Sequence, residues 1–329
     1  MSTLSISGLN VFFSTEDGPL HALKDVGFDV PEHKIVGIVG ESGCGKSTLI
    51  NAVLGLLADN GDIRSGEIMF EGQHDLTKLS TSQMRDLRGP RISTVFQDPM
   101  GALNPVLSVG QQMINIQYRD KSSKAEKAKR AIEMLKLVRI PDAESALARY
   151  PHQFSGGMKQ RIAIAMALMM EPALLIADEP TTALDATLEV TTIELLKDLQ
   201  EKIGCSVMFI SHHLGVIAEL CDDVVVMYAG EVVERGPVRD VFQNPSHPYT
   251  RRLLECDPAR QTERTRVLPT IPGEIPDLRA RPAGCVFAER CLERHEGCEV
   301  PQAESFVTAA HAARCNRAGQ AAATEGANA

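Results

Sequence analysis

GESGCGKST, residues 40–48, is the stretch that decides the fold of this 329-residue chain. The apolar run Ile35–Val39 before it has the composition of a buried strand, and Ser47–Leu57 after it has a helical pattern. A glycine-rich loop between a strand and a helix is the context that a phosphate-binding loop requires. The sequence therefore predicts an α/β protein of the P-loop nucleoside triphosphatase (NTPase) class.

Each residue type in this loop has a task in binding a polyanion. The glycines let the backbone turn tightly with its N–H groups pointing inward. Lys46 would reach the β- and γ-phosphates of ATP, and the Ser47 hydroxyl would bind Mg²⁺. A glycine turn that merely precedes a helix does not explain a lysine and a hydroxyl at the required offsets. The residues expected to hold the nucleotide are Gly40, Ser42, Gly43, Cys44, Gly45, Lys46, Ser47 and Thr48.

A second stretch, LLIADEP at residues 174–180, supplies two adjacent carboxylates. The run Leu174–Ala177 reads as a buried strand, and ligands bind at the carboxyl ends of such strands in parallel sheets. Asp178 is expected to hold Mg²⁺, and Glu179 to polarise the attacking water as general base. Two acids after an apolar run are weak evidence alone, but they gain weight behind a phosphate-binding loop.

A third stretch, FSGGMKQR at residues 154–161, opens an apolar helix. It resembles the LSGGQ signature motif of ATP-binding-cassette (ABC) proteins, with Phe154 in place of Leu and Met158 in place of Gln. Ser155, Gly156 and Gly157 are retained, and a hydroxyl with amide groups at a helix N-terminus forms an anion site. In ABC proteins this site faces the ATP of a partner subunit, so the resemblance implies that one subunit cannot complete an active site.

Other positions resemble ABC motifs in the same order. Gln97 resembles the Q-loop glutamine, which senses Mg²⁺ and the attacking water, and Asp185 belongs to a stretch that resembles the D-loop of the dimer interface. His212 resembles the switch histidine that contacts the γ-phosphate, although His213 follows it where Asp is usual. Phe13 lies where an aromatic residue would stack on adenine.

The resemblance implies an ABC nucleotide-binding domain: a RecA-like core with an antiparallel β subdomain and a helical subdomain. The expected divisions are the ATPase core (1–98 and 161–240), the helical subdomain with the Q-loop exit and the signature (99–160), a small cysteine-rich C-terminal extension (241–317), and a disordered tail (318–329). The tail is expected because Ala, Gly and Thr dominate it and offer little to bury.

Composition excludes some functions and partners. A net charge of −9 argues against nucleic-acid binding, which needs clustered Lys and Arg. The N-terminus lacks a basic segment followed by an apolar one, so no secretory signal is expected. The longest apolar run, Ile162–Met170, is about half of a bilayer span. A cytosolic subunit that reaches the membrane through partners is expected.

Four of the eight cysteines crowd into the last 45 residues. Disulfides are disfavoured in a cytosolic protein, so metal binding is the leading interpretation. Four thiolates suit either zinc or an iron–sulfur cluster, and the spacing lacks the paired CxxC of many zinc sites. From the residues alone both metals, and unligated thiols, stay open.

The C-terminal half carries a closer resemblance. GEVVERGPVRDVFQNPSHPYTRRLL, LPTIPGEIPDL and GCVFAERC are similar to the extension of the oligopeptide and dipeptide importer ATPases, a group that also serves nickel and glutathione uptake. Some members hold a [4Fe–4S] cluster, which implies four ligands here and favours iron–sulfur over zinc. These ligands would be Cys285, Cys291, Cys298 and Cys315.

The resemblance also implies partners and a location. They are a second, homologous ABC ATPase subunit in a heterodimer, two transmembrane permease subunits, and indirectly an extracytoplasmic substrate-binding protein, at the cytoplasmic face of the inner membrane. The signature and the methionine-rich helix after it are more like the first ATPase of the peptide-importer pair. Two alternatives come from other classes: a soluble ABC ATPase of DNA repair or translation, and a redox-sensing module.

Overall fold

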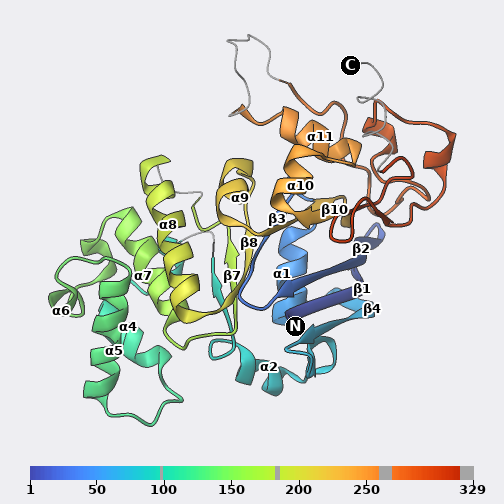
Figure 1. Cartoon of the computed structure of the whole chain (residues 1–329). Helices are drawn as coiled ribbons and strands as arrows, with labels where there is room; N and C mark the ends of the chain where they lie inside the picture. The colour runs from blue at the N-terminus through green and yellow to red at the C-terminus, as the bar shows by residue number, and fades with distance from the viewer. Residues whose placement is uncertain (97–98, 182–185, 259–268, 319–329) are drawn as a thin grey trace. The chain divides into compact units, whose positions relative to one another are not determined.

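The computed structural model describes residues 1–96, 99–181, 186–258 and 269–318 of the chain (Figure 1). The chain divides into two compact units. Unit 1 comprises Met1, Pro31–Lys34 and Ser80–Ile210, and unit 2 comprises Ser2–Val30, Ile35–Leu79 and Ser211–Ala329. The divisions expected from the sequence follow motifs rather than contacts, so they stay a prediction.

Unit 2 contains a four-stranded sheet in the order β2-β1-β4-β5. Figure 1 labels β2, β1 and β4 of this sheet. Strand β1 pairs antiparallel with β4, with Leu4 opposite Phe70 and Phe13 opposite Gly61. The apolar side chains of β1 that face the core, including Leu4 and Leu9, are fully buried. The strands are β1 (Ser2–Thr15), β2 (Gly18–Pro31), β4 (Gly61–Phe70) and β5 (His74–Asp75).

A second sheet of unit 2 carries the phosphate-binding loop. Strand β3 (Ile35–Val39) pairs parallel with β9 (Asp223–Tyr228), and β9 pairs antiparallel with β10 (Glu231–Pro237). Strand β10 also pairs with the two-residue strand β12 (Ala312–Ala313), which in turn pairs with β11 (Ser305–Phe306). Strands β11 and β12 therefore extend the sheet that contains β3, the strand before the phosphate-binding loop.

The helices of unit 2 are short. Helix α1 follows the loop, and its apolar side chains, such as Leu49 and Val53, are buried. It ends earlier than the sequence pattern indicated because Gly55 takes a left-handed conformation (φ 60°) that closes the helix. The helices are α1 (Lys46–Leu54), α9 (Leu214–Leu220), α10 (Val238–Gln243) and α11 (Pro248–Glu255), with 3-10 turns at Leu76–Lys78, Ala288–Arg290 and Glu296–Glu299.

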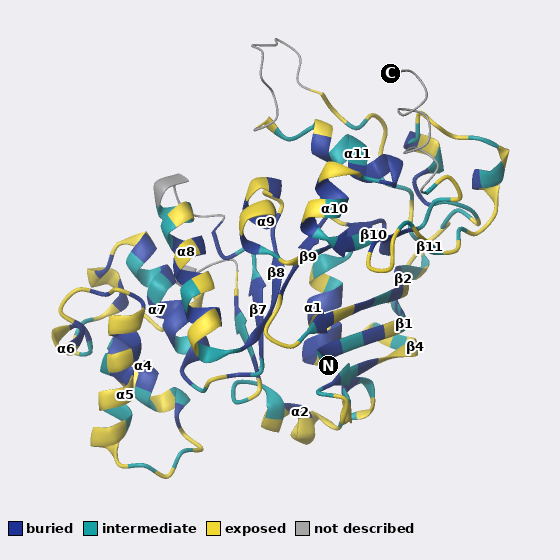
Figure 2. Cartoon of the chain, viewed as in Figure 1, coloured by how far each residue is buried: buried dark blue, intermediate teal, exposed yellow. Residues whose placement is uncertain are grey.

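Unit 1 has a parallel sheet in which β7 lies between β6 and β8. The β7 residues Leu174–Ala177 are at most 1% exposed, as expected for a central strand of a parallel sheet (Figure 2). Helices α4 and α5 each begin with a capping box, Ser108 with Gln111 and Ser123 with Glu126. The elements are α2 (Thr81–Leu87), β6 (Ile92–Val95), α3 (Pro99–Ala102), α4 (Val109–Ile116), α5 (Lys124–Leu137), α6 (Ala143–Ala146), α7 (Gly156–Leu168), β7 (Leu174–Asp178), α8 (Ala186–Ile203) and β8 (Ser206–Ile210).

The mixed α/β architecture expected from the sequence is confirmed, with its phosphate-binding loop between a strand and a helix. Among the helices of the described residues, none combines the length and apolar character needed to cross a bilayer.

Candidate functional site

The phosphate-binding loop joins the buried strand β3 to α1, and its shape depends on glycine. Gly40 has φ 151°, and a Cβ there would lie 2.1 Å from the carbonyl oxygen of Met227. Gly43 and Gly45 also have positive φ, 80° and 106°. A side chain at position 40 is therefore excluded by backbone that cannot move aside.

The loop leaves the N-terminus of α1 open to a ligand. The residue before the helix is Gly45, which has no side chain to cap the first amide groups. Ser42 and Ser47 are exposed, whereas the Cys44 side chain is buried and burial raises the pKa of its thiol. Cys44 can therefore contact a bound ligand only through its backbone. Uncapped amides, exposed hydroxyls and a nearby lysine fit a nucleotide phosphate chain with its Mg²⁺.

Lys46 donates hydrogen bonds to two carbonyl oxygens of its own loop, those of Gly40 (2.6 Å) and Glu41 (3.2 Å). The ammonium group therefore lies over the loop. An anionic ligand offers it stronger, charge-assisted hydrogen bonds than these neutral carbonyls do. Lys46 is thus positioned to exchange loop carbonyls for phosphate oxygens.

Glu41, the second residue of the loop, is held by two side chains from later in the sequence. Its backbone N–H donates to the Tyr249 hydroxyl (2.9 Å). Its carboxylate accepts two hydrogen bonds from Arg290, at 2.8 Å (Oε2 to Nη1) and 3.1 Å (Oε1 to Nη2). Burial opposes the charge of Arg290, but hydrogen bonds to Glu41 and Tyr228 outweigh it and raise the pKa of the guanidinium. Sequence reasoning missed this pair, whose members are 249 positions apart and share no local pattern.

His212 also lies in unit 2, directly after β8. The N–H of Ser211 donates to the carbonyl oxygen of Ile38 (3.3 Å), which fixes this turn beside the strand that leads into the loop. The His212 ring is exposed and meets the ring of His213 edge to face, with centroids 4.2 Å apart. His213, which replaces the usual Asp, therefore contacts the candidate switch histidine directly.

Phe13 lies on β1, and its ring lies so close to Gly61 that a Cβ there would be 2.7 Å from the ring. Its neighbour Phe12 stacks on His21 (centroids 3.9 Å apart), and the Arg64 guanidinium lies 4.0 Å from its centroid. The adenine-stacking role of Phe13 stays a prediction.

In unit 1, the two candidate catalytic carboxylates follow β7. Asp178 is in register with Ile210 of β8, and the Glu179 N–H donates to the Ile210 carbonyl oxygen (3.0 Å). Glu179 has φ 45°, a left-handed conformation that costs a residue with a side chain about 1 to 3 kcal/mol. Both carboxylates are part-buried at the carboxyl end of the parallel sheet.

The signature stretch forms the start of α7. Ser155 is the N-cap, and its hydroxyl accepts the N–H of Met158 (3.4 Å). Ser155 and Gly156 are exposed, whereas Phe154 is buried with the Arg149 guanidinium 4.3 Å from its ring centroid. The replacement of Leu by Phe154 thus keeps a buried apolar anchor, and the capped, exposed helix start has the form of an anion site. Gln97 and Asp185 lie outside the described residues.

The expected iron–sulfur centre is wrong, and so is its zinc alternative. In the part of the chain that the structure describes, no group of three or more His, Cys, Asp or Glu side chains could hold a metal ion. The cysteines are unbridged. Burial, with a smaller effect of the neighbouring thiols, raises the pKa of Cys285 to about 11 and also raises the pKa of Cys291 and Cys315. The cysteines that were expected to hold the metal are Cys285, Cys291, Cys298 and Cys315.

Two family models match the chain. The model described as "ABC transporter" matches residues 23–182. The model described as "Oligopeptide/dipeptide transporter, C-terminal region" matches residues 233–298. The second match covers much of the segment that the sequence analysis assigned to the extension.

Curated relatives match over nearly the whole chain. The chain is 47% identical over 320 residues to a probable peptide ABC transporter ATP-binding protein, y4tR, of Sinorhizobium fredii, covering 96% of this chain and 95% of that protein. It is 46% identical over 315 residues to the dipeptide transport ATP-binding protein DppD of Bacillus subtilis (95% and 93%). It is 44% identical over 305 residues to the oligopeptide transport ATP-binding protein OppD of Salmonella typhimurium (92% and 90%).

Solved structures resemble a large part of the chain. One is the ATP-binding cassette MJ0796 in a dimeric post-hydrolysis state bound to ADP and Pi, with a TM-score of 0.63 and 29% identity over 72% of this chain and 99% of that one. Another is cbiO1 from Clostridium perfringens, part of the ABC transporter complex cbiONQ, with a TM-score of 0.64 and 32% identity over 74% of this chain and 91% of that one.

Proposed function

Because the chain belongs to the family of peptide ABC transporter ATP-binding proteins, we propose that it hydrolyses ATP to energise the import of di- and oligopeptides. The observation that carries the proposal is the open phosphate-binding loop, with an uncapped helix start and Lys46 lying over it. Relatives named as peptide, dipeptide and oligopeptide transport proteins, matched over more than nine tenths of the chain, support peptides as the cargo.

The chain's own residues divide the chemical work. The loop amides and Lys46 bind the phosphates, and Ser47 would bind Mg²⁺, which when bound offsets the charge that develops on the transferred phosphoryl group. Asp178 keeps its expected role as a ligand of Mg²⁺. Glu179 orients the attacking water and accepts its proton, and His212 donates to the γ-phosphate. Gln97 keeps its proposed role of sensing the metal and the water.

A second subunit completes the site. Ser155 and Gly156 are exposed at the start of α7, where a hydroxyl and amide groups suit an anion. We propose that this surface receives the ATP bound to a homologous but different ATPase, with Asp185 at the interface. The dimeric state of the MJ0796 cassette, a structural relative of this chain, supports such pairing.

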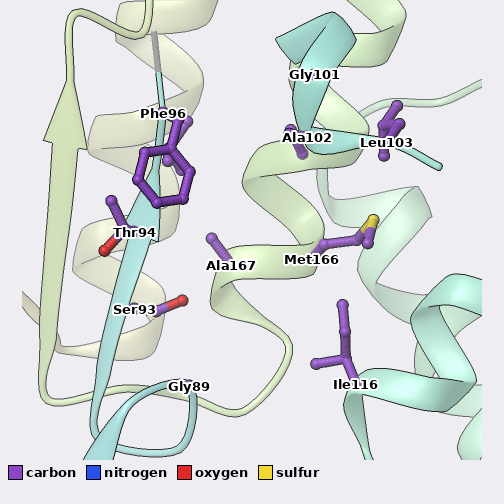
Figure 3. Close-up of a pocket in the computed structure, with 12 residues that line it drawn as sticks. Gly89, Ser93, Thr94, Phe96, Gly101, Ala102, Leu103, Ile116, Met166 and Ala167 are labelled. Carbon is purple, nitrogen blue, oxygen red and sulfur yellow. The ribbon is translucent and has the colours of Figure 1, made fainter. Parts of the chain in front are cut away.

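A groove in unit 1 is the proposed contact with the permease. It has a volume of about 630 Å³ and lies beside the end of β6 (Figure 3). Phe96 is 53% exposed at this end, and apolar side chains of α4 and α7, including Ile116 and Met166, face the same space. A cytoplasmic helix of a permease subunit, with an apolar side chain to insert, would cover this surface.

This contact would place the chain at the cytoplasmic face of the inner membrane as a peripheral subunit. Two permease subunits would carry the cargo across the membrane, and an extracytoplasmic binding protein would deliver it. The test is to tag the chain in its native cell, solubilise the membranes gently and identify the co-purifying proteins by mass spectrometry. Two permease subunits and a second ATPase are expected, and recovery free of any permease would contradict the proposal.

A further inference from the structure

Arg290 connects the C-terminal part of unit 2 to the phosphate-binding loop, and hydrogen bonds hold its side chain in one orientation. Besides its two hydrogen bonds to Glu41, it donates from Nε to the carbonyl oxygen of Pro272 (2.8 Å) and from Nη2 to that of Ile271 (3.0 Å). Nη1 also donates to the Tyr228 hydroxyl (3.2 Å). The side chain is 5% exposed. All three guanidinium nitrogens are thus engaged, so the direction of the fork toward Glu41 is fixed.

The surroundings of this arginine are tightly packed. Tyr228, Tyr249 and Phe287 are at most 1% exposed and pack on one another, with ring centroids 4.6, 5.2 and 5.4 Å apart. The backbone before Tyr249 is also held, because the buried Glu234 carboxylate accepts the N–H groups of Ser246 (2.7 Å) and His247 (2.9 Å). Arg290 and the Tyr249 hydroxyl therefore approach the loop from a rigid base.

Glu41 is the only acidic residue in GESGCGKST. A carboxylate in a phosphate-binding loop repels the polyanion that the loop must bind, unless a cation offsets its charge. Arg290 is that cation, and its bidentate geometry also fixes where the carboxylate points. The pair thus has both an electrostatic and a geometric effect on the loop.

We propose that Arg290 is a positioning residue of the nucleotide site, which neutralises and orients Glu41 so that the C-terminal part of unit 2 sets the affinity of the loop for ATP. The proposal rests on the proposed ATP-binding function. It assigns to this segment a role in nucleotide binding, although none of its residues is expected to touch the nucleotide.

The test measures the Kd of the full chain for a non-hydrolysable ATP analogue with Mg²⁺ by calorimetric titration. Arg290→Ala leaves Glu41 charged and unpaired, and is expected to weaken binding roughly tenfold. Arg290→Lys keeps the positive charge but loses the bidentate geometry, so its Kd is expected to lie between those of the wild type and Arg290→Ala. The double variant Glu41→Gln with Arg290→Ala removes the repulsion as well, and is expected to return to within about threefold of wild type.

Arg235→Ala is the matched control. Arg235 makes a similar bidentate pair with Glu304 in the same unit (2.7 and 2.8 Å). That pair does not include a residue of the loop, so the Kd is expected to stay at the wild-type value. Melting temperatures of the nucleotide-free variants report any loss of folding.

Two results would overturn the proposal: wild-type affinity in Arg290→Ala, or no recovery of affinity when Glu41→Gln is added, because a purely structural arginine would not be rescued by removing a charge. If Arg290→Ala does not fold, the Kd of Arg290→Lys is compared with that of the double variant Arg290→Lys with Glu41→Gln. A wild-type chain that binds no nucleotide would instead contradict the proposed function.

Discussion

Asp178 and Glu179 are neighbours in the sequence but differ in backbone conformation. Asp178 continues β7 in register with Ile210, whereas Glu179 turns out of the strand with φ 45°. A residue held in a left-handed conformation at the end of a central strand has its side chain aimed by the fold. The proposed roles, Asp178 as a metal ligand and Glu179 as the base, therefore fall on residues with different backbone conformations.

The role of Glu179 can be tested with Glu179→Gln. The amide keeps the size of the side chain but cannot accept the proton of the attacking water, so turnover is expected to fall about 10²- to 10⁴-fold. ATP binding should be unchanged, because the phosphate-binding loop is intact. The measurement is the ATPase rate of the assembled complex with its partner subunit, beside the Kd for ATP, and wild-type turnover would remove Glu179 from the catalytic role.

At the scale of elements, the phosphate-binding loop depends on the space around Gly40. In Gly40→Ala the new Cβ would meet the Met227 carbonyl oxygen of the neighbouring strand β9, 2.1 Å away, so the loop or the strand must shift. Binding of ATP is expected to weaken, because the shift displaces the backbone N–H groups and Lys46 that hold the phosphates.

The matched control for this variant is Gly72→Ala. Gly72 also has positive φ, 63°, but a Cβ there has no atom within 4 Å. It carries the conformational cost without the clash, so stability should fall while the Kd for ATP stays the same. Equal loss of affinity in the two variants would show that backbone strain, rather than the clash beside the loop, is responsible.

The groove of unit 1 makes a separate prediction about assembly. Phe96→Glu places a charge on the exposed rim of an apolar surface, so co-purification with the permease subunits should be lost. ATP affinity of the isolated chain should not change. Leu137→Glu, at the end of α5 and 39% exposed, does not line the groove and serves as the control. Retention of the permease by the Phe96 variant would exclude this surface as the contact.

The individual strands show how much of the fold the sequence patterns can predict. Strand β3 matches the predicted range, Ile35–Val39, residue for residue, because it is a short apolar run between Lys34 and the glycine loop. The first half of β4 gives no apolar signal, because its residues pair with β1 but are largely exposed. The two-residue strand β12 gives no local signal and is defined by its pairing with β10 and β11.

At the scale of the whole molecule, the nucleotide-binding stretches were recognisable because each one is local. The contacts that support them are not: the Glu41–Arg290 pair joins distant parts of the chain, and only the structure shows it. The cysteines, by contrast, led to a wrong prediction. Their crowding in the sequence predicted an iron–sulfur centre, but in the described residues no group of three or more His, Cys, Asp or Glu side chains could hold a metal ion.

If this chain supplies the ATPase activity for peptide import, peptide uptake must depend on it. The most direct measurement is the uptake of labelled di- and oligopeptides by native cells that lack the chain, complemented with the wild type or with Glu179→Gln. Uptake should disappear without the chain, return with the wild type and stay absent with the variant. Restoration of full peptide uptake by Glu179→Gln, or normal uptake without the chain, would show that peptide import does not depend on ATP hydrolysis by this chain.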